Sequence, residues 1–260
     1  MKKLFMSLLV LFTAVSLFGC SAQTEETPIT ETTATWADQL KTPGKIVIGI
    51  SPDYPPFESL TTTGTIEGFD IDMINTLMTY LDEDVELEFA QMEFSTIVTA
   101  VQTGQVDIGL SGFTYDADRD VIFSDPYLSS SQVVLVKKDS GIAALTDLTG
   151  KTIGAQLGTT GEEAANSVEG VKEVVTFNDT LVGLESLNNG IVDAFVTDKA
   201  VAQNYESTGD YIILEEPLLD ESVSIIVKNG NDLLADKINE LIQQFTESAD
   251  YETLVAKWGV

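Results

Sequence analysis

The chain has 260 residues, of which 43% are apolar, and its 42 acidic residues outnumber 13 Lys and Arg to give a formal net charge of −29. This length suffices for one large or two small domains, and so acidic a surface disfavours binding to nucleic acid or to anionic lipid headgroups. The sequence has no His and one Cys, which excludes His-based acid–base chemistry, Cys/His zinc sites and intrachain disulfides.

The N-terminal residues have the pattern of a secretory signal. Lys2 and Lys3 precede an apolar run over 4–18, which is too short to span a bilayer comfortably but has the length of a signal's hydrophobic region. The run ends at Leu17-Phe18-Gly19-Cys20, which resembles the lipobox of bacterial lipoproteins, although Phe18 replaces the usual small residue. We therefore predict a signal peptide at 1–19 and a protein anchored outside the cytoplasm, to the cell membrane, by lipid on Cys20. The alternative is an ordinary signal peptide with an incidental Cys.

Residues 21–35 are rich in Thr and Glu and have almost no apolar content. Such a composition buries too little surface to order itself, so we predict that 20–35 is the lipidated Cys and a flexible tether.

From about Trp36 onward, strand and helix signals alternate, which predicts an α/β fold with parallel strands. Asp70 stands where an N-cap of the first helix is expected. The expected strands are 45–50, 85–89, 106–110, 133–136, 153–155, 174–177 and 191–196, and the expected helices are 71–81, 94–103 and 181–188.

Two segments of the sequence resemble each other at an offset of 86 residues. Gly104-Gln105-Val106-Asp107 and Gly190-Ile191-Val192-Asp193 share Gly, Val and Asp, and each follows a helix signal and precedes a polar cluster. This similarity predicts two α/β lobes of common design. Open α/β sheets bind ligands at the carboxyl ends of their strands, so facing lobes would enclose a site between them.

Arg119 is the only arginine of the chain and follows the polar cluster 111–114. A guanidinium presents a rigid fork of donors suited to a carboxylate. The alternative is a surface salt bridge with Asp116, Asp118 or Asp120, and the spacing leaves both open. The run 158–161 (GTTG) offers backbone N–H groups at an expected helix N-terminus, where an anion such as a carboxylate binds well.

The sequence contains an ordered series of motifs at 50–58 (ISPDYPPFE), 68–72 (GFDID), 111–114 with Arg119, 123–127 (FSDPY), 158–160 and 193–198. This series resembles the polar amino-acid family (family 3) of extracellular solute-binding proteins of ABC transporters, in its lipoprotein form. The resemblance covers nearly all of residues 40–260 and implies a two-lobed, type II periplasmic-binding-protein-like fold. Each lobe would be a mixed sheet flanked by helices, and two crossing strands would join the lobes. Lobe 1 would comprise 36–130 plus 222–260, and lobe 2 would comprise 131–221.

The resemblance also implies roles for individual residues. Arg119 would bind the ligand α-carboxylate with the Thr160 backbone and the Thr114 hydroxyl, and Asp198 would bind the α-ammonium with the Gly112 carbonyl. Tyr54 and Phe94 would sandwich the ligand side chain, which Gln156, Ser51 and Thr197 would read. The full predicted set is Ser51, Tyr54, Phe94, Ser111, Gly112, Thr114, Arg119, Gln156, Thr159, Thr160, Thr197 and Asp198.

The resulting hypothesis is a monomeric, non-enzymatic protein that captures a polar or cationic L-amino acid and delivers it to an ABC permease with a cytoplasmic ATPase. Neutral groups at the matched positions favour arginine slightly ahead of glutamine, and the lack of a second matched cation disfavours acidic ligands. Asp53 and Glu58 flank Tyr54 and are expected to add negative potential at the mouth of the site. The hypothesis includes no cofactor, no metal and no nucleic acid.

Two alternatives belong to other classes. A ligand-sensing domain of the same fold would continue into a transmembrane helix, which the sequence does not show after the predicted lobes. A dehydratase acting on prephenate-like acids would need a buried carboxylic acid beside the arginine.

Overall fold

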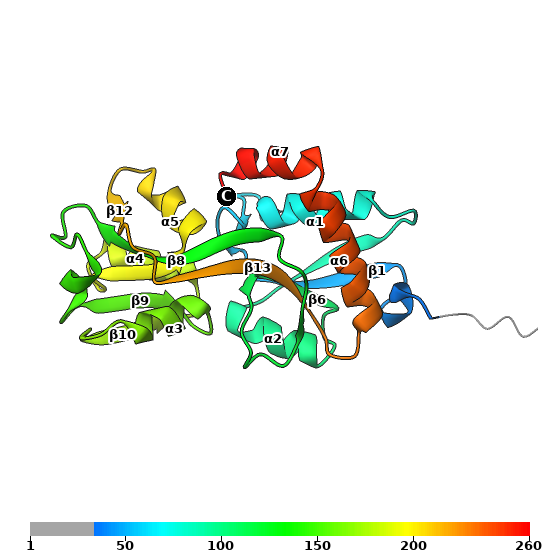
Figure 1. Cartoon of the computed structure of the whole chain (residues 1–260), viewed down its shortest axis with the longest axis horizontal. Helices are drawn as coiled ribbons and strands as arrows, with labels where there is room; N and C mark the ends of the chain where they lie inside the picture. Colours follow the sequence, from blue (N-terminus) through cyan, green and yellow to red (C-terminus); the bar gives the residue numbers. More distant parts are fainter. Residues whose placement is uncertain (1–33) are drawn as a thin grey trace, which may run out of the picture. The chain divides into compact units, whose positions relative to one another are not determined.

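The computed structural model describes residues 34–260, so the predicted signal peptide, Cys20 and nearly all of the predicted tether lie outside the described residues. Within 34–260, two long strands form the middle of the fold (Figure 1). β8 (Leu128–Lys137) and β13 (Leu219–Val227) run antiparallel, with Val223 opposite Leu128. Figure 1 shows these two strands passing between two groups of helices, which are the two lobes. The predicted two-lobed α/β fold is therefore confirmed.

Both lobes have the same strand arrangement. In the first lobe, β1 (Lys45–Ile50) pairs in parallel with β5 (Glu86–Gln91) and with β6 (Ile108–Thr114). In the second lobe, β9 (Thr152–Gln156) pairs in parallel with β10 (Glu173–Phe177) and with β11 (Ala194–Asp198). The main path through the sheet has the order β10-β9-β11-β8-β13-β6-β1-β5, so the long strands continue one lobe into the other.

The 86-residue offset corresponds to a repeated hydrogen-bond arrangement. The Asp107 carboxylate accepts the backbone N–H of Val47 at 2.7 Å, and the Val47 carbonyl accepts the N–H of Asp107 at 2.8 Å. The Asp193 carboxylate accepts the N–H of Thr152 at 2.9 Å, and the Thr152 carbonyl accepts the N–H of Asp193 at 2.8 Å. Each Asp thus fixes the start of its strand against the neighbouring strand, which confirms the common design of the lobes.

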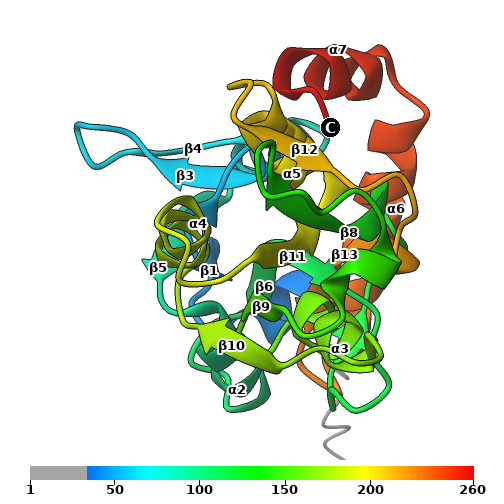
Figure 2. The same cartoon turned by 90° about the vertical axis from the view of Figure 1, so that its left-hand side faces the viewer.

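Helices cover both faces of the sheet. Figure 2 looks at the second lobe from its end and shows α3 (Thr160–Ser167) and α4 (Thr180–Asn188) on opposite sides of β9 and β11. The other helices are α1 (Phe69–Thr79), α2 (Phe94–Gln102), α5 (Lys199–Glu206), α6 (Asp232–Thr246) and α7 (Ala249–Trp258), with short 3-10 turns at Trp36–Gln39 and Leu145–Leu148. The short strands are β2 (Asp53–Tyr54), β3 (Glu58–Leu60), β4 (Ile66–Glu67), β7 (Ile122–Phe123) and β12 (Tyr211–Ile213).

Three predicted boundaries were wrong for identifiable reasons. The first helix begins at Phe69 with Gly68 as its N-cap, so Asp70 lies inside the helix and is buried. Gly68 has φ +149°, and a Cβ there would lie 1.9 Å from the Phe57 carbonyl oxygen, so this close approach requires glycine. Strand β6 continues to Thr114 because it pairs with β13 there. Strand β11 begins at Ala194 rather than Ile191, and the Ile191 side chain is exposed.

The described part of the chain, residues 34–260, contains no helix that is both long enough and apolar enough to span a bilayer.

Candidate ligand-binding site

A small cavity lies between the two lobes, where the carboxyl ends of β6, β9 and β11 meet. Its lining is mostly polar, with the aromatic rings of Tyr54 and Phe94 as its large apolar surfaces. The lining residues are Asp53, Tyr54, Phe94, Ser111, Gly112, Thr114, Arg119, Gln132, Gln156, Thr159, Thr160 and Asp198.

Ten of the twelve residues predicted from the sequence line this cavity, and the other two lie directly behind it. The Ser51 hydroxyl donates to a carboxylate oxygen of Asp53 at 2.7 Å. The Thr197 hydroxyl lies 2.9 Å from the Tyr54 hydroxyl. Ser51 and Thr197 can therefore influence a ligand through Asp53 and Tyr54, which line the cavity. Direct contact of Ser51 and Thr197 with the ligand stays a prediction.

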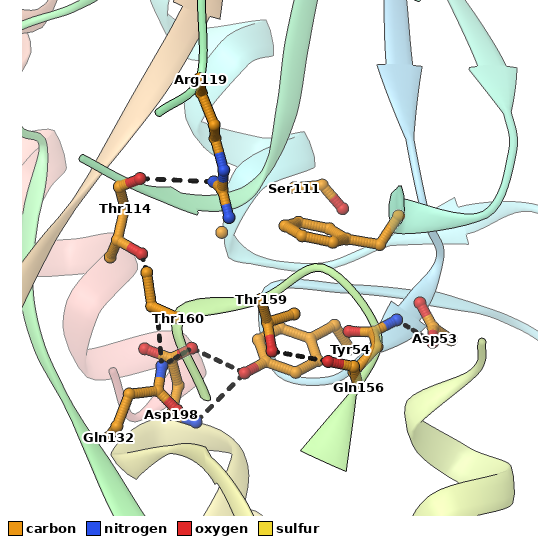
Figure 3. Close-up of a pocket in the computed structure, with 12 residues that line it drawn as sticks. Asp53, Tyr54, Ser111, Thr114, Arg119, Gln132, Gln156, Thr159, Thr160 and Asp198 are labelled. Atoms are coloured by element: carbon orange, nitrogen blue, oxygen red, sulfur yellow. Dashed lines mark hydrogen bonds between the residues drawn. The ribbon is translucent and has the colours of Figure 1, made fainter. Parts of the chain in front are cut away.

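Arg119 combines the two alternatives that the sequence left open. Its Nε lies 3.3 Å from a carboxylate oxygen of Asp116, which is the predicted local ion pair. One terminal nitrogen donates to the carbonyl of Thr114 at 3.4 Å (Figure 3), and the other donates to the carbonyl of Gly158 in the other lobe at 2.9 Å. The side chain is only 9% exposed, and burial lowers the pKa of the guanidinium, which nevertheless stays charged at neutral pH. Arg119 is thus an ion-paired arginine that faces the cavity.

Two phenylalanine rings lie beside this guanidinium. Its central carbon lies 5.7 Å from the ring centre of Phe94 and 5.4 Å from that of Phe113. The two rings stack on each other with their centres 4.7 Å apart. A cation beside aromatic faces is stabilised electrostatically, so the rings help to hold the guanidinium in place.

Asp198 is the carboxylate on the opposite lobe. One of its oxygens accepts hydrogen bonds from the Tyr54 hydroxyl at 2.6 Å and from the Gln132 amide at 3.1 Å (Figure 3). The other oxygen accepts a hydrogen bond from the Ser130 hydroxyl. Burial raises the pKa of Asp198, while these three donors act in the opposite direction and favour the ionised form. Tyr54 belongs to the first lobe, so its hydroxyl also joins the two lobes.

The predicted helix N-terminus at 158–161 is confirmed. Helix α3 starts at Thr160 with Thr159 as its N-cap, whose hydroxyl oxygen accepts the N–H of Glu162 at 3.1 Å. The Thr160 hydroxyl lies 3.0 Å from the Thr114 hydroxyl of the first lobe. The positive end of this helix therefore faces the cavity on the side where Thr114 lies.

Two residues that line the cavity were not predicted as ligand contacts. Gln132 stands opposite Asp198 in the β8–β11 pairing, a relation that only the register of the sheet reveals. Asp53 was expected at the mouth, but it is 5% exposed and lies inside the cavity wall, where the N-terminus of α4 covers it. Glu58 was also expected at the mouth and is completely buried behind Ser111.

A pair of buried carboxyl groups supports the cavity wall from behind. Glu58 accepts the Ser111 hydroxyl at 2.6 Å, and Asp70 accepts the Tyr127 hydroxyl at 2.9 Å and the N–H of Gly112 at 3.4 Å. Burial raises the pKa of Asp70 to about 7. Burial, and after it the negative charge of Asp70, raises the pKa of Glu58 well above its usual range. These groups hold the strand that carries Ser111 and Gly112.

Comparison with known proteins identifies the family. The model for bacterial extracellular solute-binding proteins, family 3, matches residues 46–260. The arginine-binding extracellular protein ArtP of Bacillus subtilis is 30% identical over 221 residues, which are 82% of this chain and 86% of that protein. The ABC transporter glutamine-binding protein GlnH of the same organism is 28% identical over 272 residues, covering 99% and 97% of the two chains. A crystal structure of the substrate-binding protein of an amino acid ABC transporter is 40% identical with a TM-score of 0.77, covering 83% of this chain and 99% of that one. The chain belongs to family 3 of the bacterial extracellular solute-binding proteins.

Proposed function

We propose that this protein captures a polar or cationic L-amino acid, arginine ahead of glutamine, between its lobes and delivers it to the permease of an ABC importer without chemical conversion. The observation that carries the proposal is that a cation and an anion from facing lobes, Arg119 and Asp198, line one cavity. This pair is complementary to the α-carboxylate and α-ammonium that every amino acid presents. Relatives of the chain are named for binding arginine, glutamine, histidine and cystine.

In this proposal the α-carboxylate binds on the Arg119 side of the cavity. The guanidinium supplies charged donors, and the N-terminus of α3 supplies backbone N–H groups at Thr160. The α-ammonium donates to Asp198, whose ionised form its surrounding donors favour. Because Asp198 is buried and the Arg119 side chain is only 9% exposed, solvent screens these interactions little.

The remaining surface of the cavity favours a planar polar side chain. Tyr54 and Phe94 present aromatic rings, and a guanidinium beside an aromatic face gains about 0.5–2 kcal/mol. Gln156 offers an amide at the same wall. Apart from Arg119, no Lys or Arg lines this cavity in the described part of the chain, so a side-chain carboxylate would lack a cationic partner. Aspartate and glutamate are therefore disfavoured.

A thermal-shift screen of the common L-amino acids tests the proposal. A ligand at 100 times its dissociation constant stabilises the folded state by about 2.7 kcal/mol, which is readily measured. We expect arginine and glutamine to give the largest shifts, followed by calorimetry for affinity. The ligand assignment is refuted if glutamate or a branched aliphatic amino acid binds more tightly than both.

One observation favours the dehydratase alternative enough to test it. Glu221 lies beside Gln132 and Asp198, and burial together with the charge of Asp198 raises its pKa to about 7, so it is a partly buried acid near the arginine. An ancestral amino acid-binding protein described as a precursor of cyclohexadienyl dehydratase is 32% identical, with a TM-score of 0.77. Incubation with prephenate-like acids should give no product if the protein only binds, whereas turnover that Glu221→Gln abolishes would make it an enzyme.

The proposal includes the anchor and the lobe limits predicted from the sequence. The protein would act as a monomer held outside the cytoplasm by lipid on Cys20, with lobe 1 at 36–130 plus 222–260 and lobe 2 at 131–221. Its family, whose members are extracellular solute-binding proteins, supports this location. The course of β8 and β13 between the lobes supports the limits at 130 and 222.

A further inference from the structure

Glu58 and Asp70 are two completely buried carboxyl groups of the first lobe, and neither lines the cavity. Glu58 belongs to β3 and Asp70 to the first turn of α1. The Asp70 N–H donates to the Phe57 carbonyl at 3.0 Å, which fixes these two elements against each other. The pair is bonded to Ser111 and Gly112, which do line the cavity, so it acts on a ligand only through this part of the wall.

Two negative charges at this position would have no compensation. No Lys or Arg within residues 34–260 forms an ion pair with Glu58 or Asp70. Burial is the largest cause of the raised pKa of each group, and the other charged residues that act on them, Asp53 and Asp198, are acidic and raise these pKa values further. Because two buried carboxylates repel each other strongly, one of the pair must keep its proton.

The surrounding donors decide which group keeps the proton. Asp70 accepts the Tyr127 hydroxyl at 2.9 Å and the Gly112 N–H at 3.4 Å, and both donors favour its carboxylate form. Glu58 accepts one donor, the Ser111 hydroxyl, at Oε1. Its Oε2 is buried and receives no hydrogen bond from any group in the described part of the chain. A proton on Oε2 turns this oxygen into a donor, and the Asp70 carboxylate is the acceptor beside it, because a hydrogen bond between the two side chains also raises the pKa of Glu58 and lowers that of Asp70.

The Ser111 hydroxyl places the proton on Oε2 rather than on Oε1. Its oxygen accepts the Ser51 N–H at 3.1 Å, and its hydrogen is donated to Oε1 of Glu58 at 2.6 Å. A proton on Oε1 would take away this acceptor and would still leave Oε2 without a partner. With the proton on Oε2, Glu58 accepts from the cavity wall and donates to α1, so both of its oxygens have partners.

We propose that Glu58 is a positioning residue of the binding site, which stays neutral, donates its Oε2 proton to Asp70 and thereby holds Ser111 and Gly112 where the ligand meets them. The inference rests on the proposed function, because it takes an amino acid to bind in this cavity. Ionisation of Glu58 would place a second buried negative charge against Asp70 and separate the wall from α1.

Infrared spectroscopy of the purified protein at pH 8 tests the proton without any ligand. Ordinary carboxyl groups are ionised at this pH, and Asp70 and Glu221, whose pKa values are raised to about 7, are mostly ionised as well. We expect the carbonyl band of a protonated carboxyl group in the wild type and its loss in Glu58→Gln. Glu67→Gln is the matched control, because Glu67 is an exposed glutamate on the neighbouring strand β4, and it should keep the band.

Calorimetry with L-arginine and L-glutamine at pH 8 tests the positioning role. Glu58→Gln replaces a neutral acid with a neutral amide that can also accept from Ser111 and donate to Asp70, so its affinity should stay within about threefold of the wild type. Glu58→Met keeps a similar volume but loses both hydrogen bonds, so binding should weaken by at least about tenfold. Thermal unfolding checks that each variant is folded, and if Glu58→Met does not fold, Glu58→Gln and the infrared band decide the question.

Each contrary result overturns a stated part of the proposal. A wild-type spectrum without the band would show that Glu58 is ionised. A loss of affinity in folded Glu58→Gln of tenfold or more would show that a neutral donor does not suffice, and wild-type affinity in Glu58→Met would remove the positioning role. If the wild type binds neither arginine nor glutamine, the proposed function fails, whereas the infrared result on the proton stands independently of it.

Discussion

Replacement of Arg119 is the most informative perturbation of the binding site, because its two structural roles make different predictions. As a ligand clamp, the guanidinium would donate two charge-assisted hydrogen bonds to the α-carboxylate. As a local ion pair, it would serve only Asp116, from which its Nε lies 3.3 Å away. Arg119→Ala removes both interactions and Asp116→Asn removes only the second, so the two variants separate the roles.

The magnitude follows from burial. Charge-assisted hydrogen bonds contribute about 1.5–3 kcal/mol each, and truncating one member of a buried charged pair costs about 2–5 kcal/mol. The Arg119 side chain is 9% exposed, so solvent does little to reduce these values. Arg119→Ala should therefore weaken ligand binding by roughly 30-fold to several thousand-fold. Arg119→Lys keeps the charge but loses the planar fork, so its loss should be intermediate.

Isothermal titration calorimetry with arginine and with glutamine measures both variants, and thermal unfolding checks that each remains folded. Asp116→Asn should cost less than about tenfold in affinity, because Asp116 orients the guanidinium without lining the cavity. Lys237→Ala is a further control, since Lys237 pairs with Glu240 on the surface of α6, and it should bind like the wild type. A loss of less than threefold in Arg119→Ala would refute the clamp and leave Arg119 as a structural ion pair.

Three further predictions concern stability and anchoring. The pKa of Asp70 is raised to about 7, so between pH 4 and 7 the folded state binds more protons than the unfolded state, and the free energy of unfolding should fall as pH rises through this range. Urea unfolding at pH 5 and at pH 8 measures this change in the free energy of unfolding. Glu58→Gln should reduce the change, because the pKa of Glu58 is also raised. A free energy of unfolding that rises with pH over this range would contradict the prediction. Gly183→Ala places a Cβ 2.3 Å from the Phe195 ring and should cost about 1–3 kcal/mol in urea unfolding, whereas Val182→Ala on the exposed side of the same helix should change stability by less than about 0.5 kcal/mol. Cys20→Ser should move the protein from the membrane fraction to the soluble fraction or block its maturation, and unchanged fractionation on immunoblots would exclude the lipid anchor.

Local patterns predicted those parts of the fold that depend on local interactions. The helix start at Thr160 depends on contacts within a few residues, and each repeated Asp bonds within one pair of strands. The alternation of strands and helices was likewise visible in short stretches of the sequence. The motifs that resemble the family supplied ten residues of the cavity wall. The helix N-cap at Gly68 escaped prediction, because only the packing of Phe57 against it excludes a side chain there.

The two missed cavity residues depend on contacts between distant segments. Gln132 faces Asp198 because β8 and β11 pair in one particular register, across 66 residues of sequence. Asp53 is inside rather than at the mouth because the N-terminus of α4, 127 residues away, donates to it. Neither position follows from a motif, since Gln132 needs the register of two strands within the second lobe and Asp53 needs the second lobe to be placed against the first.

The repeated Asp residues connect the fold to the position of the binding site. Asp107 and Asp193 each fix the start of a strand beside its parallel neighbour, and each of these strands, β6 and β11, then runs to the cavity. The carboxyl end of β6 carries Ser111–Thr114, and that of β11 carries Asp198. Because both strands also pair with a long strand that is shared between the lobes, their ends are directed toward one another. A single repeated arrangement thus brings an anion from one lobe opposite a cation held by the other, which is the geometry that a zwitterionic ligand requires.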